Sequence, residues 1–200
     1  MTRSFSVNWD YRCPFARNAH EHVVAGLKAG ADWDVEFVPF SLSQVHVDEG
    51  GTPVWEDPAK ARDLLAMRAG LVVRDTQPER FLDVHLALFS ARHGQGRDLR
   101  DPEVVRSILA EAGADAGSVM AALDEGAALD GFRKEHEASA DENGVWGVPT
   151  FVVGERAAFA RLMTRPEADA TASVALIERV VDAVGGWSEL NELKHTTLSR

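Results

Sequence analysis

The sequence predicts an α/β fold in which a block of helices interrupts one sheet. Three observations predict it: a strand–helix–strand pattern opens the chain, no strand pattern occurs between about residues 54 and 141, and a strand–strand–helix pattern closes it. The 200 residues are 45% apolar and 26% charged, which is typical of a globular chain with a substantial core. We therefore expect a sheet domain from residues 1–53 and 142–200, and an inserted α-helical domain over 54–141.

The opening unit is predicted from alternation and from prolines. Residues 4–9 (SFSVNW) alternate polar and apolar side chains with period two, which predicts a strand. Pro14 is favoured at the first position of a helix, and Gly30 is a plausible end for that helix. Residues 33–40 predict a second strand, placed at a sheet edge or ending there because Pro39 cannot donate to a ladder. Such a unit is almost always a right-handed crossover with parallel strands.

The middle of the chain carries helix caps. Two N-cap residues are followed by proline, at Asp57-Pro58 and Asp101-Pro102, and Thr76 to Glu79 has the spacing of a capping box. Glycines at positions 70, 94 and 113 fall where helices should end. After the Asn143-Gly144 turn, residues 148–153 and 157–160 predict two strands, antiparallel because their connection is short. A final helix stops at Gly185-Gly186, and we expect the tail to be ordered through its apolar residues Trp187, Leu190 and Leu193.

Charge and cysteine content exclude several function classes. The formal net charge of −11 argues against a nucleic-acid partner, and no apolar run approaches the roughly 20 residues of a membrane span. The first ten residues are expected to form a strand and not a signal peptide. Cys13 is the single cysteine, so an internal disulfide is excluded and a reducing compartment, the cytoplasm, is expected.

Cys13 is the candidate nucleophile because it precedes Pro14 at a predicted strand-to-helix junction. Unpaired N–H groups and the positive dipole end of the helix stabilise a thiolate there, so we expect the thiol pKa to fall into the range of about 3.5 to 7.5. Arg12 and Arg17 would add to this effect if their side chains turn inward. The alternative is that Cys13 is a small buried apolar residue.

Two motifs, separated by the helical block, make this chain similar to a known superfamily. Residues 10–16 (DYRCPFA) and 147–151 (GVPTF), in this order, resemble the DsbA-like thioredoxin superfamily over nearly the whole chain. Within it the chain looks most like the mycothiol-dependent nitroreductase type, on four stretches: Ser41-Leu42, residues 93–96 (HGQG), residues 159–166 (FARLMTRP) and residues 192–194 (ELK). The resemblance implies a thioredoxin-like fold with a helical insertion between its β-α-β and β-β-α halves.

The resemblance also implies a site and a mechanism. It places a cis peptide at Val148-Pro149 beside Cys13, where the Val148 backbone would pair with an incoming thiol or peptide. The family's second cysteine is replaced by Ala16, so a mixed disulfide at Cys13 has no resolving sulfur in this chain. Turnover would then use an external low-molecular-weight thiol, mycothiol or glutathione, as co-substrate, with no tightly bound cofactor.

The residues expected to bind the substrate or the thiol surround these motifs: Arg12, Pro14, Phe15, His46, Trp146, Val148, Pro149 and Thr150. The alternatives are a core position for Phe15, plain packing for Trp146 and an exposed loop for His46. No metal site is expected, because His20 and His22 do not face each other on a helix. The expected partners are a small thiol and an electrophile or disulfide; the sequence does not decide whether the chain forms a homodimer.

The sequence is therefore compatible with three functions. The first is a monothiol oxidoreductase, which should form a mixed disulfide at Cys13 and lose activity in Cys13→Ser. The second is a thiol transferase or isomerase resembling kappa-class glutathione transferases and chromene-carboxylate isomerases, in which Cys13 replaces a serine as hydrogen-bond donor and serine should be tolerated. The third is a non-catalytic thioredoxin-fold binding protein.

Overall fold

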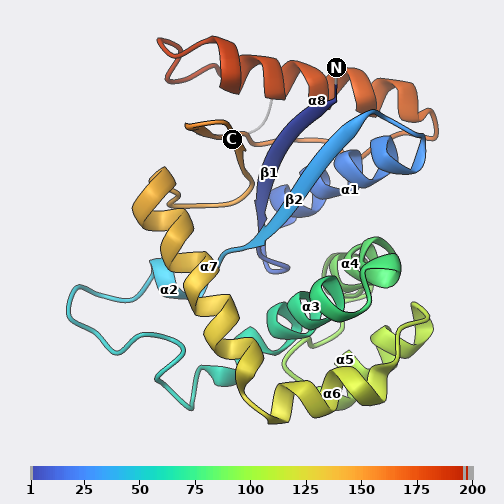
Figure 1. Ribbon diagram of the computed structural model, residues 1–200, viewed down its shortest axis with the longest axis vertical. Coiled ribbons are helices and arrows are strands. Elements are labelled where there is room, and N and C mark those ends of the chain that lie inside the picture. The colour runs from blue at the N-terminus through green and yellow to red at the C-terminus, as the bar shows by residue number, and fades with distance from the viewer. Residues whose placement is uncertain (1, 196, 198–200) are drawn as a thin grey trace.

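A computed structural model describes residues 2–195 and 197 (Figure 1). In these residues β1 (Arg3–Trp9), β2 (Trp33–Pro39), β3 (Thr150–Val153) and β4 (Arg156–Phe159) form a sheet in the order β2-β1-β3-β4. β1 is parallel to β2 and antiparallel to β3, which is antiparallel to β4. The chain thus has the predicted thioredoxin-like α/β fold, and β2 is an edge strand, as Pro39 requires.

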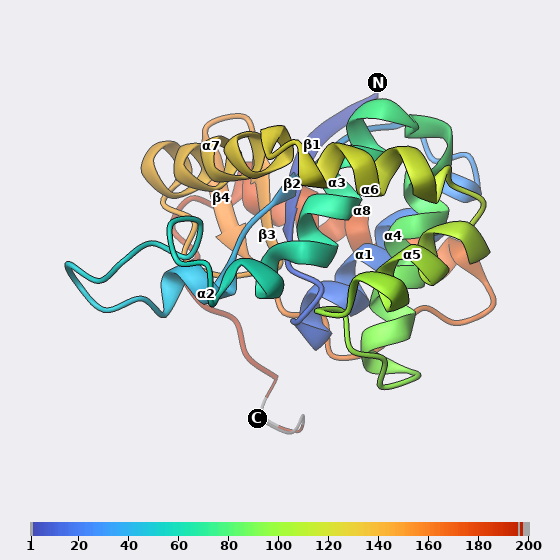
Figure 2. The same ribbon diagram turned by 90° about the horizontal axis from the view of Figure 1, so that it is seen from below.

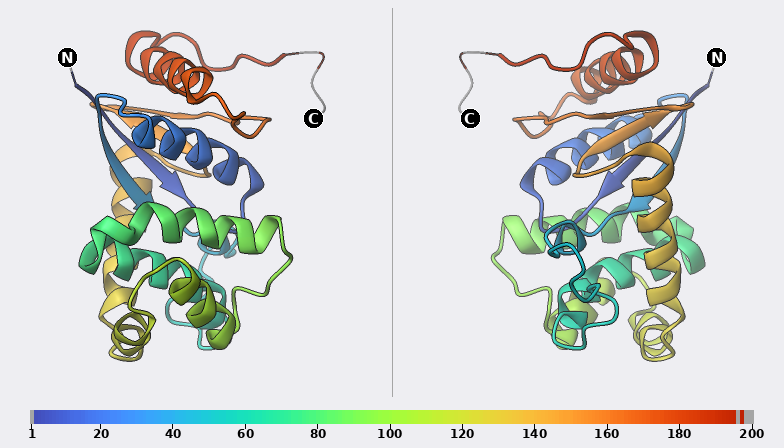
Figure 3. Two further views of the ribbon diagram at one scale, coloured as in Figure 1. Left: turned by 90° about the vertical axis from the view of Figure 1, so that its right-hand side faces the viewer. Right: turned by 90° about the vertical axis from the view of Figure 1, so that its left-hand side faces the viewer.

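Alternation in β1 assigns its side chains to two layers. Trp9 is fully buried towards α1 (Pro14–Lys28), where its ring lies 6.4 Å from that of His20. Asn8 points the other way, and its amide donates to Ser139 of α7 (Ala127–Asn143) at 3.1 Å. α1 and α8 (Ala170–Gly186) therefore cover one face of the sheet and α7 the other (Figure 3).

The helices between β2 and β3 gather at one end of the sheet (Figures 1 and 2). They are α3 (Leu65–Thr76), α4 (Pro78–His93), α5 (Pro102–Glu111) and α6 (Ala116–Asp124), after which α7 returns along the sheet. One continuous set of buried apolar residues runs from the sheet into these helices. Among the described helices, none has the length and apolar character that a bilayer crossing demands.

Several local predictions were wrong for identifiable reasons. Asp57 accepts N–H groups only in turns, and a short 3-10 helix (Ala61–Leu64) with Lys60 at its N-cap follows, so α3 begins later than expected. Thr76 ends α3, and its hydroxyl donates to the Val72 carbonyl, so it does not cap α4. Gly70 lies inside α3, where a Cβ atom would stand 2.4 Å from the Tyr11 hydroxyl. That glycine permits close packing instead of ending the helix.

The connection after β2 contains a helix that was not predicted, and the tail differs from its prediction. A short helix, α2 (Leu42–Val45), follows β2 and is capped by Ser41, whose hydroxyl accepts the Gln44 N–H at 3.2 Å. In the tail Trp187, Leu190 and Leu193 are exposed and do not pack into the core, contrary to the prediction.

Candidate functional site

Cys13 occupies the N-cap of α1. Its backbone is extended (φ −91°, ψ 118°), Pro14 takes the first helical position, and Sγ accepts the Ala16 N–H at 3.4 Å. The sulfur thus stands where a serine or aspartate oxygen normally caps a helix. The Cys13 N–H donates to the Asp10 carbonyl at 3.0 Å, which closes a turn between β1 and α1.

A buried carboxylate fixes that turn. Asp10 accepts the Arg12 N–H at 2.8 Å on one oxygen and the Leu42 N–H at 2.9 Å on the other, which ties the turn to the start of α2. Burial raises the pKa of Asp10, whereas these two N–H groups lower it. Asp10 was not predicted as a site residue; its place in the turn before Cys13 is the signal that could have identified it.

The loop before β3 lies against the sulfur. The peptide bond between Val148 and Pro149 is cis, and Cys13 Sγ donates to the Val148 carbonyl at 3.3 Å. Since Val7 of β1 pairs with Phe151 of β3, the start of β3 adjoins the end of β1. The Thr150 hydroxyl donates to the Gly147 carbonyl at 2.7 Å and is buried, so it braces the loop.

The prediction of an acidic Cys13 thiol is wrong, because the sulfur is buried. Cys13 is only 8% exposed, and burial raises the pKa of its thiol, an effect that the Ala16 and Phe15 N–H groups oppose but do not overcome. The negative charge of Asp10 raises this pKa further, and Arg161 lowers it. At neutral pH the sulfur is therefore mainly a protonated thiol, consistent with its hydrogen bond to the Val148 carbonyl.

The two arginines that would lower the thiol pKa if they turned inward make their contacts elsewhere. Arg12 is hydrogen-bonded to Ser43 and lies 4.0 Å from Asp63, and Arg17 contacts the Asn18 side chain. His46 ends α2, and its ring bonds the Leu42 carbonyl. None of these contacts involves the sulfur.

Aromatic side chains and one cation border the site instead. Phe15 is half-buried two residues after Cys13, and the Arg161 guanidinium lies 4.6 Å from the centre of its ring. The same guanidinium is 5.7 Å from the ring of Phe159, on which the 65% exposed Trp146 packs at 4.9 Å. Arg161 was missed as a site residue because only the fold brings the end of β4 to the start of α1.

A histidine of the insertion supports the same turn. The His93 ring, at the end of α4, donates to the Tyr11 carbonyl at 2.9 Å. Burial lowers the pKa of His93, so the ring is neutral at pH 7. The helical block therefore helps to position the segment that carries Cys13.

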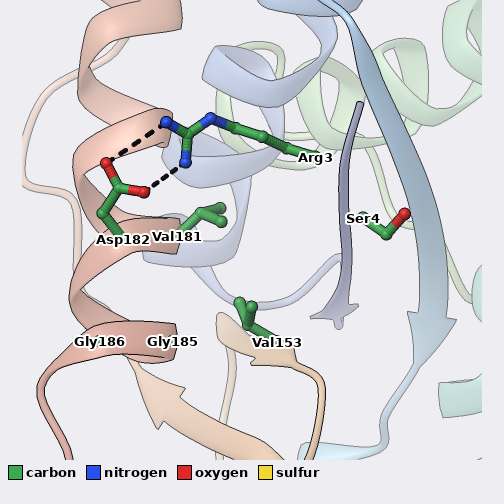
Figure 4. Close-up of a pocket in the computed structure, with 7 residues that line it drawn as sticks. All are labelled: Arg3, Ser4, Val153, Val181, Asp182, Gly185 and Gly186. Atoms are coloured by element: carbon green, nitrogen blue, oxygen red, sulfur yellow. Dashed lines mark hydrogen bonds and ion pairs between the residues drawn. The ribbon is translucent and has the colours of Figure 1, made fainter. Parts of the chain in front are cut away.

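Two surface hollows lie away from the sulfur. One, of about 320 Å³, lies between the start of β1 and the end of α8, and its cation Arg3 is paired with Asp182 (Figure 4). The other, of about 670 Å³, follows edge strand β2. Cys13 follows the opposite end of β1 from Arg3 and lines neither hollow.

Comparison with known proteins agrees with the fold. Residues 6–170 match the DSBA-like thioredoxin domain. An uncharacterized protein of Mycobacterium tuberculosis is 27% identical over 188 residues, which cover 94% of this chain and 79% of that protein. DsbA of Pseudomonas aeruginosa superposes with a TM-score of 0.61 at 19% identity, over 90% of this chain and 81% of that one. A 2-hydroxychromene-2-carboxylate isomerase superposes with a TM-score of 0.63 at 15% identity, over 93% and 100%.

Proposed function

Because this chain belongs to the DSBA-like thioredoxin domain family, we propose that it is a thiol–disulfide oxidoreductase of the monothiol type. Members of that family include DsbA oxidoreductases, and Cys13 is the single cysteine of this chain. The single observation that carries the proposal is the placement of Cys13 at the N-cap of α1, in contact with the carbonyl that precedes cis-Pro149.

The proposed cycle has two exchange steps at Cys13. The Cys13 thiolate attacks one sulfur of a substrate disulfide, so that a mixed disulfide forms and the other half leaves as a thiolate. An external thiol, mycothiol or glutathione, then attacks the substrate-derived sulfur of the mixed disulfide as its thiolate. This attack releases the Cys13 thiolate and leaves that half of the substrate in a disulfide with the external thiol. A second external thiol then releases this half by direct exchange, so that the substrate is fully reduced and two external thiols are oxidised to one disulfide. The proton released by each attacking thiol is taken up by a leaving thiolate.

The helix start and the buried position act against each other in this cycle. The Ala16 and Phe15 N–H groups stabilise the thiolate when it forms, while burial limits how much thiolate is present at rest. A low resting reactivity and a free thiol both suit a reducing compartment, so a cytoplasmic location is part of the proposal.

The test is capture of the mixed disulfide. Wild-type protein treated with bis(2-hydroxyethyl) disulfide should gain the mass of one half-disulfide at Cys13, and added glutathione should remove it. Cys13→Ser should show no adduct. Its rate of bis(2-hydroxyethyl) disulfide reduction by glutathione should fall at least about a hundredfold, because a hydroxyl is not ionised at neutral pH. Full turnover in Cys13→Ser would contradict the proposal.

A second function has a specific observation in its favour. Because burial raises its pKa, the Cys13 thiol is protonated and donates a hydrogen bond, which is what an isomerase or transferase would need to hold the sulfur of a bound thiol. The similarity to a 2-hydroxychromene-2-carboxylate isomerase extends over all of that chain. Retained turnover in Cys13→Ser would favour this function; absence of both adduct and turnover in the wild type would favour a non-catalytic binding protein.

A further inference from the structure

Arg161 is an exposed cation held on aromatic rings beside the thiol. It follows β4, and its guanidinium lies over both Phe15 and Phe159. Contact with the rings accounts for how the side chain is held, because a guanidinium is attracted to an aromatic face. The N–H groups of a guanidinium lie in its plane, so these ring contacts do not satisfy them.

Within residues 2–195 and 197, no carboxylate lies within ion-pair distance of Arg161 and no acceptor is hydrogen-bonded to it. Some arginines of the chain do have acidic partners; Arg165, four residues later, pairs with Glu21 at 2.6 Å. Arg161 thus offers an open set of donors next to Cys13.

We propose that Arg161 binds the carboxylate of a flat, apolar small-molecule substrate whose body packs on Trp146 and Phe15. This inference rests on the proposed function, because it assigns a substrate class to the same site. A single guanidinium matches one carboxylate through two parallel hydrogen bonds. Trp146, mostly exposed, supplies an aromatic face for the rest of the molecule.

Arg161 also acts on the sulfur, and the experiment has to separate the two effects. Burial raises the pKa of Cys13, and the positive charge of Arg161 lowers it, so any substitution of Arg161 also reduces the thiolate fraction. Two probes attacked by the same thiolate at the same pH share that fraction. The ratio of their rate constants therefore reports recognition of the probe alone.

The test compares 5,5′-dithiobis(2-nitrobenzoate), a flat disulfide with carboxylates, with the neutral 4,4′-dithiodipyridine. Arg161→Gln should lower the ratio of the carboxylate rate to the neutral rate by about tenfold or more, as expected for a lost charge-assisted hydrogen bond. Added salt should lower the wild-type ratio and leave that of the variant nearly unchanged. The matched control is Arg100→Gln, which makes the same charge change at an exposed residue paired with Asp98, and should keep the wild-type ratio.

An equal loss of rate with both probes would overturn the inference, because Arg161 would then act only through the sulfur. A second measurement is independent of thiol chemistry: binding of 4-nitrobenzoate and of neutral 4-nitrobenzamide to the Cys13→Ser protein. Adding Arg161→Gln should weaken the binding of the benzoate only. If Cys13 reacts with neither probe while this selectivity is seen, the proposed redox function fails and the carboxylate site stands; binding without selectivity, or no binding, overturns the site.

Discussion

At the scale of single residues, Cys13 is governed by two opposing effects. Its N-cap position offers the Ala16 N–H to the sulfur, which favours the thiolate. Its burial, with Asp10 nearby, favours the neutral thiol, and the net effect is a raised pKa. A helix N-terminus therefore does not by itself make a cysteine acidic, because removal of the sulfur from water acts in the opposite direction.

The first prediction is the pH dependence of Cys13 alkylation. The rate with iodoacetamide should rise about tenfold per pH unit from pH 7 and reach half its plateau above the value of about 8.5 for a free cysteine, because the thiolate is the reacting form. The measurement is the rate of adduct formation by mass spectrometry, with a cysteine peptide as reference. A midpoint below that of the peptide would show that the helix start outweighs burial.

At the scale of elements, a buried hydrogen-bond chain joins β1, the turn, α1 and α4. His20 Nε2 bonds the Asn8 carbonyl at 3.1 Å, and since a carbonyl only accepts, this nitrogen carries the proton. His20 Nδ1 therefore accepts from His85 Nε2 at 2.9 Å, and His85 Nδ1 accepts from the Tyr11 hydroxyl at 2.9 Å. Burial lowers the pKa of both histidines, so both are neutral at pH 7, and with these tautomers every proton in this chain has an acceptor.

The second prediction concerns the outer end of that chain. Tyr11→Phe should lower the free energy of unfolding by about 1–3 kcal/mol, because it leaves the fully buried His85 Nδ1 without a donor. The measurement is chemical unfolding followed by circular dichroism. Thr2→Ala, which removes an exposed hydroxyl bonded to Asp32, is the control and should change little; an equally small effect of Tyr11→Phe would contradict the role of the hydrogen-bond chain.

At the scale of the whole molecule, the helical block and the sheet share one core and are tied by polar contacts. Arg74 of α3 forms two hydrogen bonds with Glu135 of α7 and a third with the Phe37 carbonyl of β2. His136 of α7 accepts the N–H of Ser41, just after β2, at 3.1 Å and packs on Phe40. The stability of the two parts is therefore coupled through buried groups.

The third prediction is loss of stability in acid. Burial lowers the pKa of His20 to about 4 and that of His136 to about 4, from about 6.5 in the unfolded chain. Between these values the unfolded state binds more protons, so stability rises with pH and is lost as the pH falls from 7 to 4, on the order of 3 kcal/mol for each histidine. The measurement is the urea midpoint against pH.

His136→Gln tests this assignment, because glutamine can still accept the Ser41 N–H but cannot be protonated. The variant should have a smaller dependence of its urea midpoint on pH between 7 and 4 than the wild type has. An unchanged dependence would mean that His136 is not among the groups that set acid stability.

Much of the fold was predictable from local patterns. Alternation in residues 4–9 predicted β1, Pro14 fixed the start of α1, and Asp101-Pro102 fixed the start of α5. These signals depend on backbone conformation and on capping within a few residues, and both act before tertiary packing. Thr76 and Gly70 misled the prediction because their partners, the Val72 carbonyl and Tyr11, were not visible in the local pattern.

Local patterns along the chain fixed the main strands and helices and the place of Cys13 at a helix start, and the family resemblance predicted the contact of that start with the Val148-Pro149 loop. The burial of the sulfur, the fixing of its turn by Asp10 and the position of Arg161 over Phe15 follow from tertiary packing. The reason is that local order depends on neighbours along the chain. Burial and charge at the site depend instead on residues from β2, β4 and α4, which come together only when the chain folds.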